Sequence, residues 1–185
     1  MTTTGYALLG LLALRPWTTY ELAQQVRRSL NWFWPRAERK LYDEPKRLVA
    51  AGYATAREEF TGKRKRTVYE ITDAGRAALR AWLREPSAPP TMESEAMVKM
   101  FFADGGDLDS LRSTLAGMED AARARLAALE EMVAGEQPFP ERSHLIHLAM
   151  RQHQQQEQAM IDWAVWARAE VARWKATDDP GVTYP

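Results

Sequence analysis

Two groups of basic residues in the first half of the chain could bind a polyanion. The first is a run of four consecutive cations, Lys63, Arg64, Lys65 and Arg66, in the segment TGKRKR. Four adjacent positive charges repel one another in the free protein, and phosphate groups would relieve that repulsion. Such a run alone is weak evidence of function. The value of this run as evidence depends on where the fold places it.

The second group lies on a helix predicted over residues 36–51. The exposed side of this helix is expected to carry Arg36, Arg39, Lys40, Tyr42 and Lys46. Basic side chains in a major groove can donate to guanine edges, and a tyrosine ring can contact a thymine methyl group. The alternative is an ordinary solvated helix face. DNA is favoured because the cationic run follows at the place where a hairpin loop would reach the neighbouring backbone.

Catalysis and metal binding are not predicted. The sequence has no glycine-rich phosphate loop, no nucleophile elbow and no dense group of carboxylates or histidines. His144 and His147 lie one helical turn apart, but His153 falls nearly opposite on a straight helix. The lack of cysteine excludes disulfides and thiolate zinc sites and fits a reducing cytosol. We therefore expect a cytoplasmic protein that is not an enzyme and holds no metal or cofactor.

The first 85 residues are predicted to form three helices, a hairpin and a fourth helix. Residues 3–14 are too densely apolar for a surface helix and should lie centrally. They are also too few to span a bilayer. A signal peptide has basic residues before its apolar segment, and no Lys or Arg precedes this one. Thr18 or Thr19 can cap a second helix that ends near Leu30, with Glu21 and Gln24 near the position that a capping box requires.

The third helix should stop at Gly52, and two strand-like segments follow it. These segments, 53–60 and 66–72, are rich in β-branched and aromatic residues and flank TGKRK, so they predict a β-hairpin with the cations in its loop. Thr72 can cap a last helix over 73–84. This order of elements is that of a winged helix-turn-helix.

The second half of the chain is predicted to be helical. Three prolines in EPSAPP, 85–90, indicate a boundary before it. A short helix over 92–103 precedes a long one whose apolar residues recur at steps of three and four, namely Leu108, Leu111, Leu115, Met118, Ala122, Leu126, Leu129 and Val133. Another long helix is expected over 142–176. Three helices make a thin domain, so we expect a partner chain to cover their seams.

The formal net charge of zero conceals two halves of opposite sign. Residues 1–85 contain 16 Lys or Arg and 9 Asp or Glu, a net charge of +7, and residues 86–185 carry −7. The first half would therefore be attracted to a polyanion and the second repelled by it. Chance segregation of solvated charges is the alternative.

Two segments resemble the PadR family of winged-helix transcriptional regulators. ERKLYDEPKRLVAAGYA, 38–54, is similar to the family's recognition helix, with matches at Leu41, Tyr42, Lys46, Arg47, Leu48 and Gly52. YEITDAGRAAL, 69–79, is similar to the end of the wing and the next helix. Pro45 departs from the aliphatic residue common in the family, and its missing donor predicts a kink or a new turn.

Element order and resemblance together predict a mainly α fold with a small β-hairpin wing. The expected parts are a winged helix-turn-helix domain (1–85), a proline-rich link (86–92), a helical dimerisation and effector domain (93–176) and a tail (177–185). The layout of the second half resembles longer family members, whose acidic helical domain ends with a tryptophan-bearing helix.

The resemblance implies a homodimeric repressor that binds a palindromic operator in double-stranded DNA and is relieved by a small aromatic or amphipathic effector. The residues expected at the dimer interface are Met97, Met100, Phe101, Met160, Ala164, Ala167, Val171 and Trp174. Trp163 and Trp166 are the effector candidates, with packing as the alternative. A helical adaptor that binds proteins rather than DNA is the other class of function, and the basic hairpin argues against it.

Overall fold

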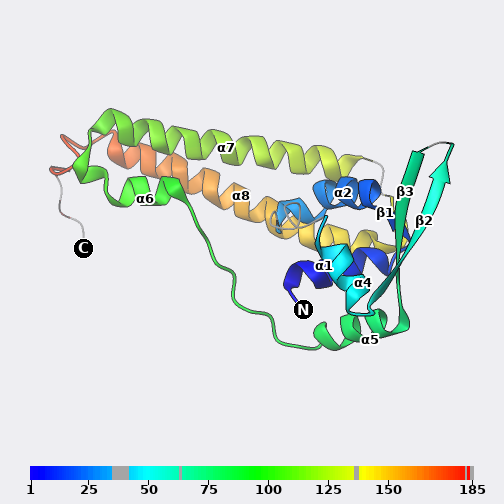
Figure 1. Cartoon of the computed structure of the whole chain (residues 1–185). Helices are drawn as coiled ribbons and strands as arrows, with labels where there is room; N and C mark the ends of the chain where they lie inside the picture. Colours follow the sequence, from blue (N-terminus) through cyan, green and yellow to red (C-terminus); the bar gives the residue numbers. More distant parts are fainter. Residues whose placement is uncertain (35–41, 63, 136–137, 182, 184–185) are drawn as a thin grey trace. The chain divides into compact units, whose positions relative to one another are not determined.

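The computed structural model describes residues 1–34, 42–62, 64–135, 138–181 and 183, and the side chains of Thr61 and Arg64 are outside this description. The chain forms two compact units, Met1–Pro89 and Pro90–Pro185 (Figure 1). Each unit is described by itself. None of the helices in the described part of the chain is both long and apolar enough to cross a membrane.

The N-terminal unit contains helices on a small antiparallel sheet. Its elements are α1 (Thr3–Leu12), β1 (Trp17–Thr18), α2 (Thr19–Arg28), the 3-10 turn η1 (Leu30–Trp32), α4 (Glu44–Ala50), β2 (Ala54–Thr61), β3 (Arg64–Ile71) and α5 (Asp73–Trp82). The predicted mainly α fold with a hairpin wing is confirmed. The strand β1 was not predicted, because two residues give no periodic signal.

Helix α1 lies at the centre of this unit, as its composition predicted. Leu8, Leu9 and Leu12 are almost completely buried, and the helix contacts α4, α5 and β3. A helix that is apolar on most sides can be stable in water only when neighbours cover it. The core therefore forms around α1, and α2 contributes Leu22 and Val26 to it.

Side-chain caps fix where the helices of this unit begin. The Thr18 hydroxyl accepts a hydrogen bond from the backbone of Glu21, and the Glu21 carboxylate accepts one from the backbone of Thr18. This is the predicted capping box, and Gln24 takes no part in it. Thr72 caps α5 by accepting from the backbone of Gly75, as predicted. Caps of this kind contribute about 1 kcal/mol each.

The sheet has the order β1–β3–β2, so β3 pairs with a strand on each side. Strands β2 and β3 pair from Ala54↔Ile71 to Thr61↔Arg64. Gly62 follows β2 with a φ of +61°, the left-handed conformation that tight hairpin turns use and that glycine adopts without strain. The strands reach closer to the turn than predicted, because Thr61 belongs to β2, and Arg64 and Lys65 belong to β3, rather than to a loop.

The start of α5 touches the backbone that leads into the hairpin. The Thr72 amide donates to the Tyr53 carbonyl oxygen, and the Thr72 hydroxyl donates to the Gly52 carbonyl oxygen. Gly75 allows this approach, because a Cβ at that position would lie 2.1 Å from the Tyr53 carbonyl oxygen. Thr72 thus connects the end of β3 to the residues that follow α4.

The C-terminal unit consists of helices. Its elements are α6 (Glu95–Phe101), the 3-10 turn η2 (Ala103–Gly105), α7 (Leu108–Ala134), the 3-10 turn η3 (Pro140–Arg142) and α8 (Ser143–Val171). Helix α8 ends five residues before the predicted Ala176. Helices α7 and α8 run antiparallel beside one another (Figure 1), and they share most of the contacts in this unit.

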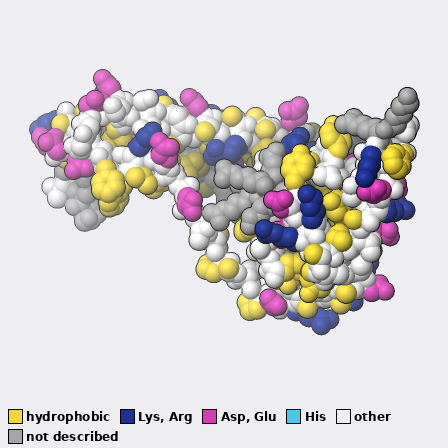
Figure 2. Space-filling view, in the orientation of Figure 1, with side chains coloured by type: hydrophobic (Ala, Val, Ile, Leu, Met, Phe, Trp, Pro, Cys, Tyr) yellow, Lys and Arg dark blue, Asp and Glu magenta, His cyan; other side chains and the backbone are white. Residues whose placement is uncertain are grey.

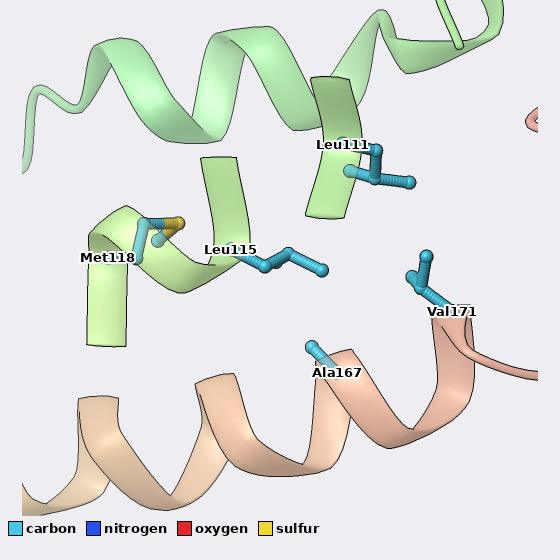
Figure 3. Packing of buried hydrophobic residues seen from close by; sticks show 5 residues of the cluster. All are labelled: Leu111, Leu115, Met118, Ala167 and Val171. Atoms are coloured by element: carbon cyan, nitrogen blue, oxygen red, sulfur yellow. The ribbon is translucent and has the colours of Figure 1, made fainter. Parts of the chain in front are cut away.

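The apolar seam of α7 packs against α8 within the same chain. Figure 3 shows Leu111 and Leu115 of α7 extending toward Val171 and Ala167 of α8, and Met118 of α7 belongs to the same buried cluster. Small residues on α8 let the two helices approach closely, and burial of the leucines stabilises the pair by about 2 kcal/mol for each side chain. The predicted seam residues Leu126 and Leu108 are only partly buried, and Val133 is exposed.

Two ion-pair groups link α7 to α8. The buried Glu119 carboxylate accepts hydrogen bonds from Arg123 on its own helix and from Arg168 on α8. The hydrogen bonds from Arg123 and then Arg168 lower the pKa of Glu119, so it stays ionised. Arg125 makes a two-pronged contact with Glu157 at 2.8 Å on each prong. Glu157 lies in the polar segment QHQQQEQ, 152–158.

We predict opposite effects for the same substitution at two helical glycines. Gly75→Ala should lower the free energy of unfolding by about 2 kcal/mol, because the new methyl group collides with backbone rather than with a flexible side chain. Gly117→Ala should raise it by about 0.5–1 kcal/mol, because nothing lies within 4 Å of that position in the middle of α7. Urea unfolding followed by circular dichroism measures both. Equal effects of the two substitutions would contradict the close packing of α5 on the hairpin.

Candidate nucleic-acid interface

Helix α4 presents a polar face beside the hairpin. It begins at Glu44 with Pro45 in its first turn, where a missing amide costs no hydrogen bond. The predicted new turn at Pro45 is therefore confirmed, and the described helix has no kink. Gly52, with a φ of +74°, ends it as predicted.

The two sides of α4 differ in burial. Pro45 and Leu48 face the core, whereas Lys46 and Arg47 are exposed. Tyr42, just before the helix, is also exposed, at 66%. Lys46 and Tyr42 thus have the accessibility that the predicted DNA contact requires. Arg47 is equally exposed but was not among the predicted DNA contacts, because it entered the sequence analysis only as a match to the family motif.

A buried carboxylate fixes the start of α4 against α1. Glu44 is 3% exposed and accepts a 2.7 Å hydrogen bond from the Thr2 hydroxyl, which also caps α1 by accepting from the Gly5 amide. The other carboxylate oxygen of Glu44 lies 3.5 Å from Arg47 Nη1. A buried charge is costly unless it is paired. The contact with Thr2 therefore restricts where α4 can lie.

Four predicted DNA contacts fall wholly outside the described residues, and a fifth does so in part. Arg36, Arg39 and Lys40 lie in the segment 35–41, and Lys63 comes between β2 and β3 in the sequence. Arg64 is described only by its backbone, which belongs to β3.

Lys65 and Arg66, the two cations of the run whose side chains are described, each form an ion pair. This corrects the expectation of a loop in which unpaired cations repel one another. Lys65 Nζ lies 2.6 Å from a carboxylate oxygen of Glu58, and Arg66 Nη2 lies 2.7 Å from one of Glu59. Arg57 Nη2 also contacts Glu59, at 3.0 Å. These carboxylates were missed because the segment REEF was read only for its strand propensity. Antiparallel pairing of 57–60 with the cationic run was the signal that could have found them.

The residues predicted at the dimer interface divide into two sets. Ala164, Ala167 and Val171 are buried within their own unit, where α8 packs on α7, so their surface is not available to a partner chain. Their burial against their own chain corrects the expectation that a partner hides them. Met100, Met160 and Trp174 are half-buried against the same core. Met97 and Phe101 of α6 are exposed, and Phe101 is 79% exposed.

The tryptophans predicted for an effector also differ. Trp163 packs against the core of the C-terminal unit, whereas Trp166 is 57% exposed. A separate open pocket of about 440 Å³ lies between α6 and the start of α7 and includes Val98, Phe102 and Leu111 in its lining. No pattern in the sequence pointed to it. In the N-terminal unit, the Trp34 indole donates to the Thr4 hydroxyl at 3.0 Å, which favours packing for that residue.

These features define the N-terminal unit as a winged helix-turn-helix and the C-terminal unit as a helical domain. A model of the transcriptional regulator PadR-like family matches residues 8–81. A second model, described as virulence activator alpha C-term, matches residues 92–172. Residues 8–81 therefore carry a PadR-like domain, as the sequence motifs predicted, and the matched family and relatives are transcriptional regulators rather than enzymes.

Relatives cover nearly the whole chain. The negative transcriptional regulator PadR of Bacillus subtilis is 27% identical over 172 residues, which are 85% of this chain and 91% of that protein. Its crystal structure in complex with operator DNA has a TM-score of 0.79 at 24% identity and covers 92% of this chain and 99% of that one. Its complex with p-coumaric acid has a TM-score of 0.72 at 24% identity, with coverage of 90% and 97%. The Vibrio cholerae virulence activator AphA has a TM-score of 0.70 at 25% identity, with coverage of 92% and 98%.

Proposed function

We propose that this regulator binds a palindromic operator as a homodimer and represses transcription until a small aromatic effector releases it. The observation that carries the proposal is the exposed face of α4, with Tyr42, Lys46 and Arg47, in the same unit as a hairpin that carries Lys65 and Arg66. An α-helix fits the major groove, and a hairpin beside it reaches the neighbouring phosphates. The operator complex of Bacillus subtilis PadR supports the same use of this fold.

In this proposal the two groups of residues make different kinds of contact. Side chains of α4 and of the segment before it, including Arg39, Tyr42 and Lys46, contact base edges. Lys63, Arg64, Lys65 and Arg66 contact phosphates, and Arg36 and Lys40 add to either set. Two protomers place their helices in successive major grooves, so half-sites lie about one helical turn apart or a multiple of it.

Alanine substitutions separate base reading from phosphate binding. At least one of Arg39→Ala, Tyr42→Ala and Lys46→Ala should weaken binding to an operator selected from random duplexes by about 1–3 kcal/mol for each base contact removed, with a much smaller loss on random DNA. Lys65→Ala should weaken both equally and lower the salt slope by about one for each phosphate that this lysine neutralises. Gel shifts at several salt concentrations measure this. Unchanged operator selectivity in all three variants would contradict base reading by this region.

Dimerisation is assigned to the exposed part of α6. Large apolar side chains at Met97 and Phe101 favour a partner surface over water, since a contiguous apolar patch is uncommon on a monomer. Ala164, Ala167 and Val171 are not part of this surface. The rims of Met100, Met160 and Trp174 that remain accessible contribute to it.

Phe101→Glu should convert the dimer to a monomer and abolish tight operator binding, because a charge at that position remains unpaired in the interface. Phe60→Glu is the matched control for the mass measurement, since Phe60 is also exposed, at 68%, but lies on the wing rather than on α6. Sedimentation velocity at micromolar protein gives the mass of each variant. A wild-type protein that sediments as a monomer alone and on operator DNA would contradict the dimer.

Effector binding is assigned to Trp166 and the adjoining Trp163. Bacillus subtilis PadR has been solved in complex with p-coumaric acid, and an exposed indole offers a stacking surface to such a flat aromatic acid. Binding to one conformation of the dimer would shift it away from the form that fits DNA.

Titration with p-coumaric acid and a panel of similar aromatic acids should quench tryptophan fluorescence and weaken operator binding. Trp166→Leu should remove both responses, whereas Leu148→Ala, another exposed residue of α8, should retain them. Phe102→Leu tests the pocket beside α6 as the alternative location. If no compound in the panel changes fluorescence or DNA affinity, the effector proposal fails.

A further inference from the structure

The wing carries its own counterions. Within the described part of the hairpin, each basic side chain lies within 3.0 Å of a carboxylate: Lys65 at Glu58, and Arg57 and Arg66 at Glu59. Figure 2 shows basic and acidic side chains interspersed on the visible face rather than gathered into patches of one sign. A phosphate that approaches this hairpin therefore meets cations that already have partners.

The strand register produces this pairing. Glu59 is directly opposite Arg66, and Arg57 is on the same face because it is two residues away along β2. Glu58 and Lys65 lie on the other face as diagonal neighbours, since Glu58 is opposite Thr67 and Lys65 is opposite Phe60. Each face of the wing thus has at least one acid–base pair, and the register decides which cation meets which carboxylate.

The carboxylates alter how the wing attracts DNA. Residues 54–71 contain five Lys or Arg and three Asp or Glu, a net charge of +2, which would be +4 without Glu58 and Glu59. Exposed ion pairs contribute little to stability, so a phosphate can displace a carboxylate from its cation. The displaced carboxylate still lies beside the phosphate and repels it, which weakens the contact.

We propose that Glu58 and Glu59 limit the affinity of the wing for DNA phosphates and thereby weaken the binding of the protein to every DNA sequence. This inference rests on the proposed DNA-binding function. A wing with unpaired cations would bind operator and random DNA more tightly by a similar factor, so the protein would leave random sites more slowly. The carboxylates lower this sequence-independent part of the binding free energy.

An alternative role for Glu58 and Glu59 predicts the opposite change in DNA affinity. If Glu58 and Glu59 chiefly orient Lys65 and Arg66 for phosphate contact, their removal would weaken DNA binding. Substitution by glutamine distinguishes the two roles, because it removes the charge but keeps a side chain of similar shape. Glu58 is 60% exposed and Glu59 29% exposed, and the glutamines fit the same space.

The experiment compares full-length Glu58→Gln/Glu59→Gln with wild type on random 30-base-pair duplexes and on the selected operator. The double variant should bind both DNAs about threefold to tenfold more tightly at about 0.1 M salt, with the operator-to-random ratio unchanged. Its plot of log affinity against log salt should steepen by about 0.9 for each additional phosphate that the wing neutralises. Glu70→Gln is the control, since Glu70 is an exposed acid near the other end of the hairpin, opposite Thr55. It removes one charge, as Glu58→Gln or Glu59→Gln does alone, and should raise the affinity less than either of these single variants.

The outcomes separate the inference from the function on which it rests. Tighter binding by the double variant, with a steeper salt slope and a small effect of Glu70→Gln, supports the inference. Weaker or unchanged binding in a variant with wild-type thermal unfolding overturns it and leaves the DNA-binding function intact. Equal increases in affinity from Glu70→Gln and from either single substitution also overturn it, because net charge alone then explains the effect. If neither wild type nor any variant binds DNA, the proposed function itself fails.

Discussion

The pairing of β2 with β3 determines what the N-terminal unit presents to a ligand. Eight cross-strand pairs run from Ala54↔Ile71 to Thr61↔Arg64, and Gly62 adopts the positive φ that closes the turn. A slip of one residue would move every side chain to the other face of the sheet. It would also separate Arg66 from Glu59. Which cation meets which carboxylate is therefore a property of the register, and the same residues in a flexible loop would form a different surface.

The sheet and α4 are held in one arrangement by the buried centre of the unit. Helix α1 supplies leucines to the core and, through Thr2, the hydroxyl that binds the buried Glu44 at the start of α4. At the other end of α4, Gly52 leads into Tyr53, whose carbonyl oxygen accepts from Thr72 beside α5. Both ends of the short helix are thus attached to elements that belong to the core. A DNA-reading helix needs this restraint, because recognition of base edges depends on accurate placement.

Most of the fold could be predicted from the sequence because its signals are local. The capping box at Thr18, the stop at Gly52 and the apolar steps along α7 each depend on residues a few positions apart. The errors concern partners distant in sequence. Apolar steps show that Ala164 and Ala167 are buried, but they do not distinguish burial against α7 of the same chain from burial against a second chain. The cations of the hairpin were likewise recognised without Glu58 and Glu59, because only the strand register brings them together.

The central claim is that α4 and the segment before it read base edges in two successive major grooves while the wings contact phosphates. Methylation of guanine N7 in an operator selected by the wild-type protein tests this most directly, since the methyl group blocks the major-groove edge and leaves the phosphates unchanged. The account predicts that methylation interferes at guanines in two symmetric groups, about 10 base pairs or a multiple of that distance apart. Binding that tolerates methylation at every guanine, while remaining sensitive to ethylation of phosphates, would contradict it.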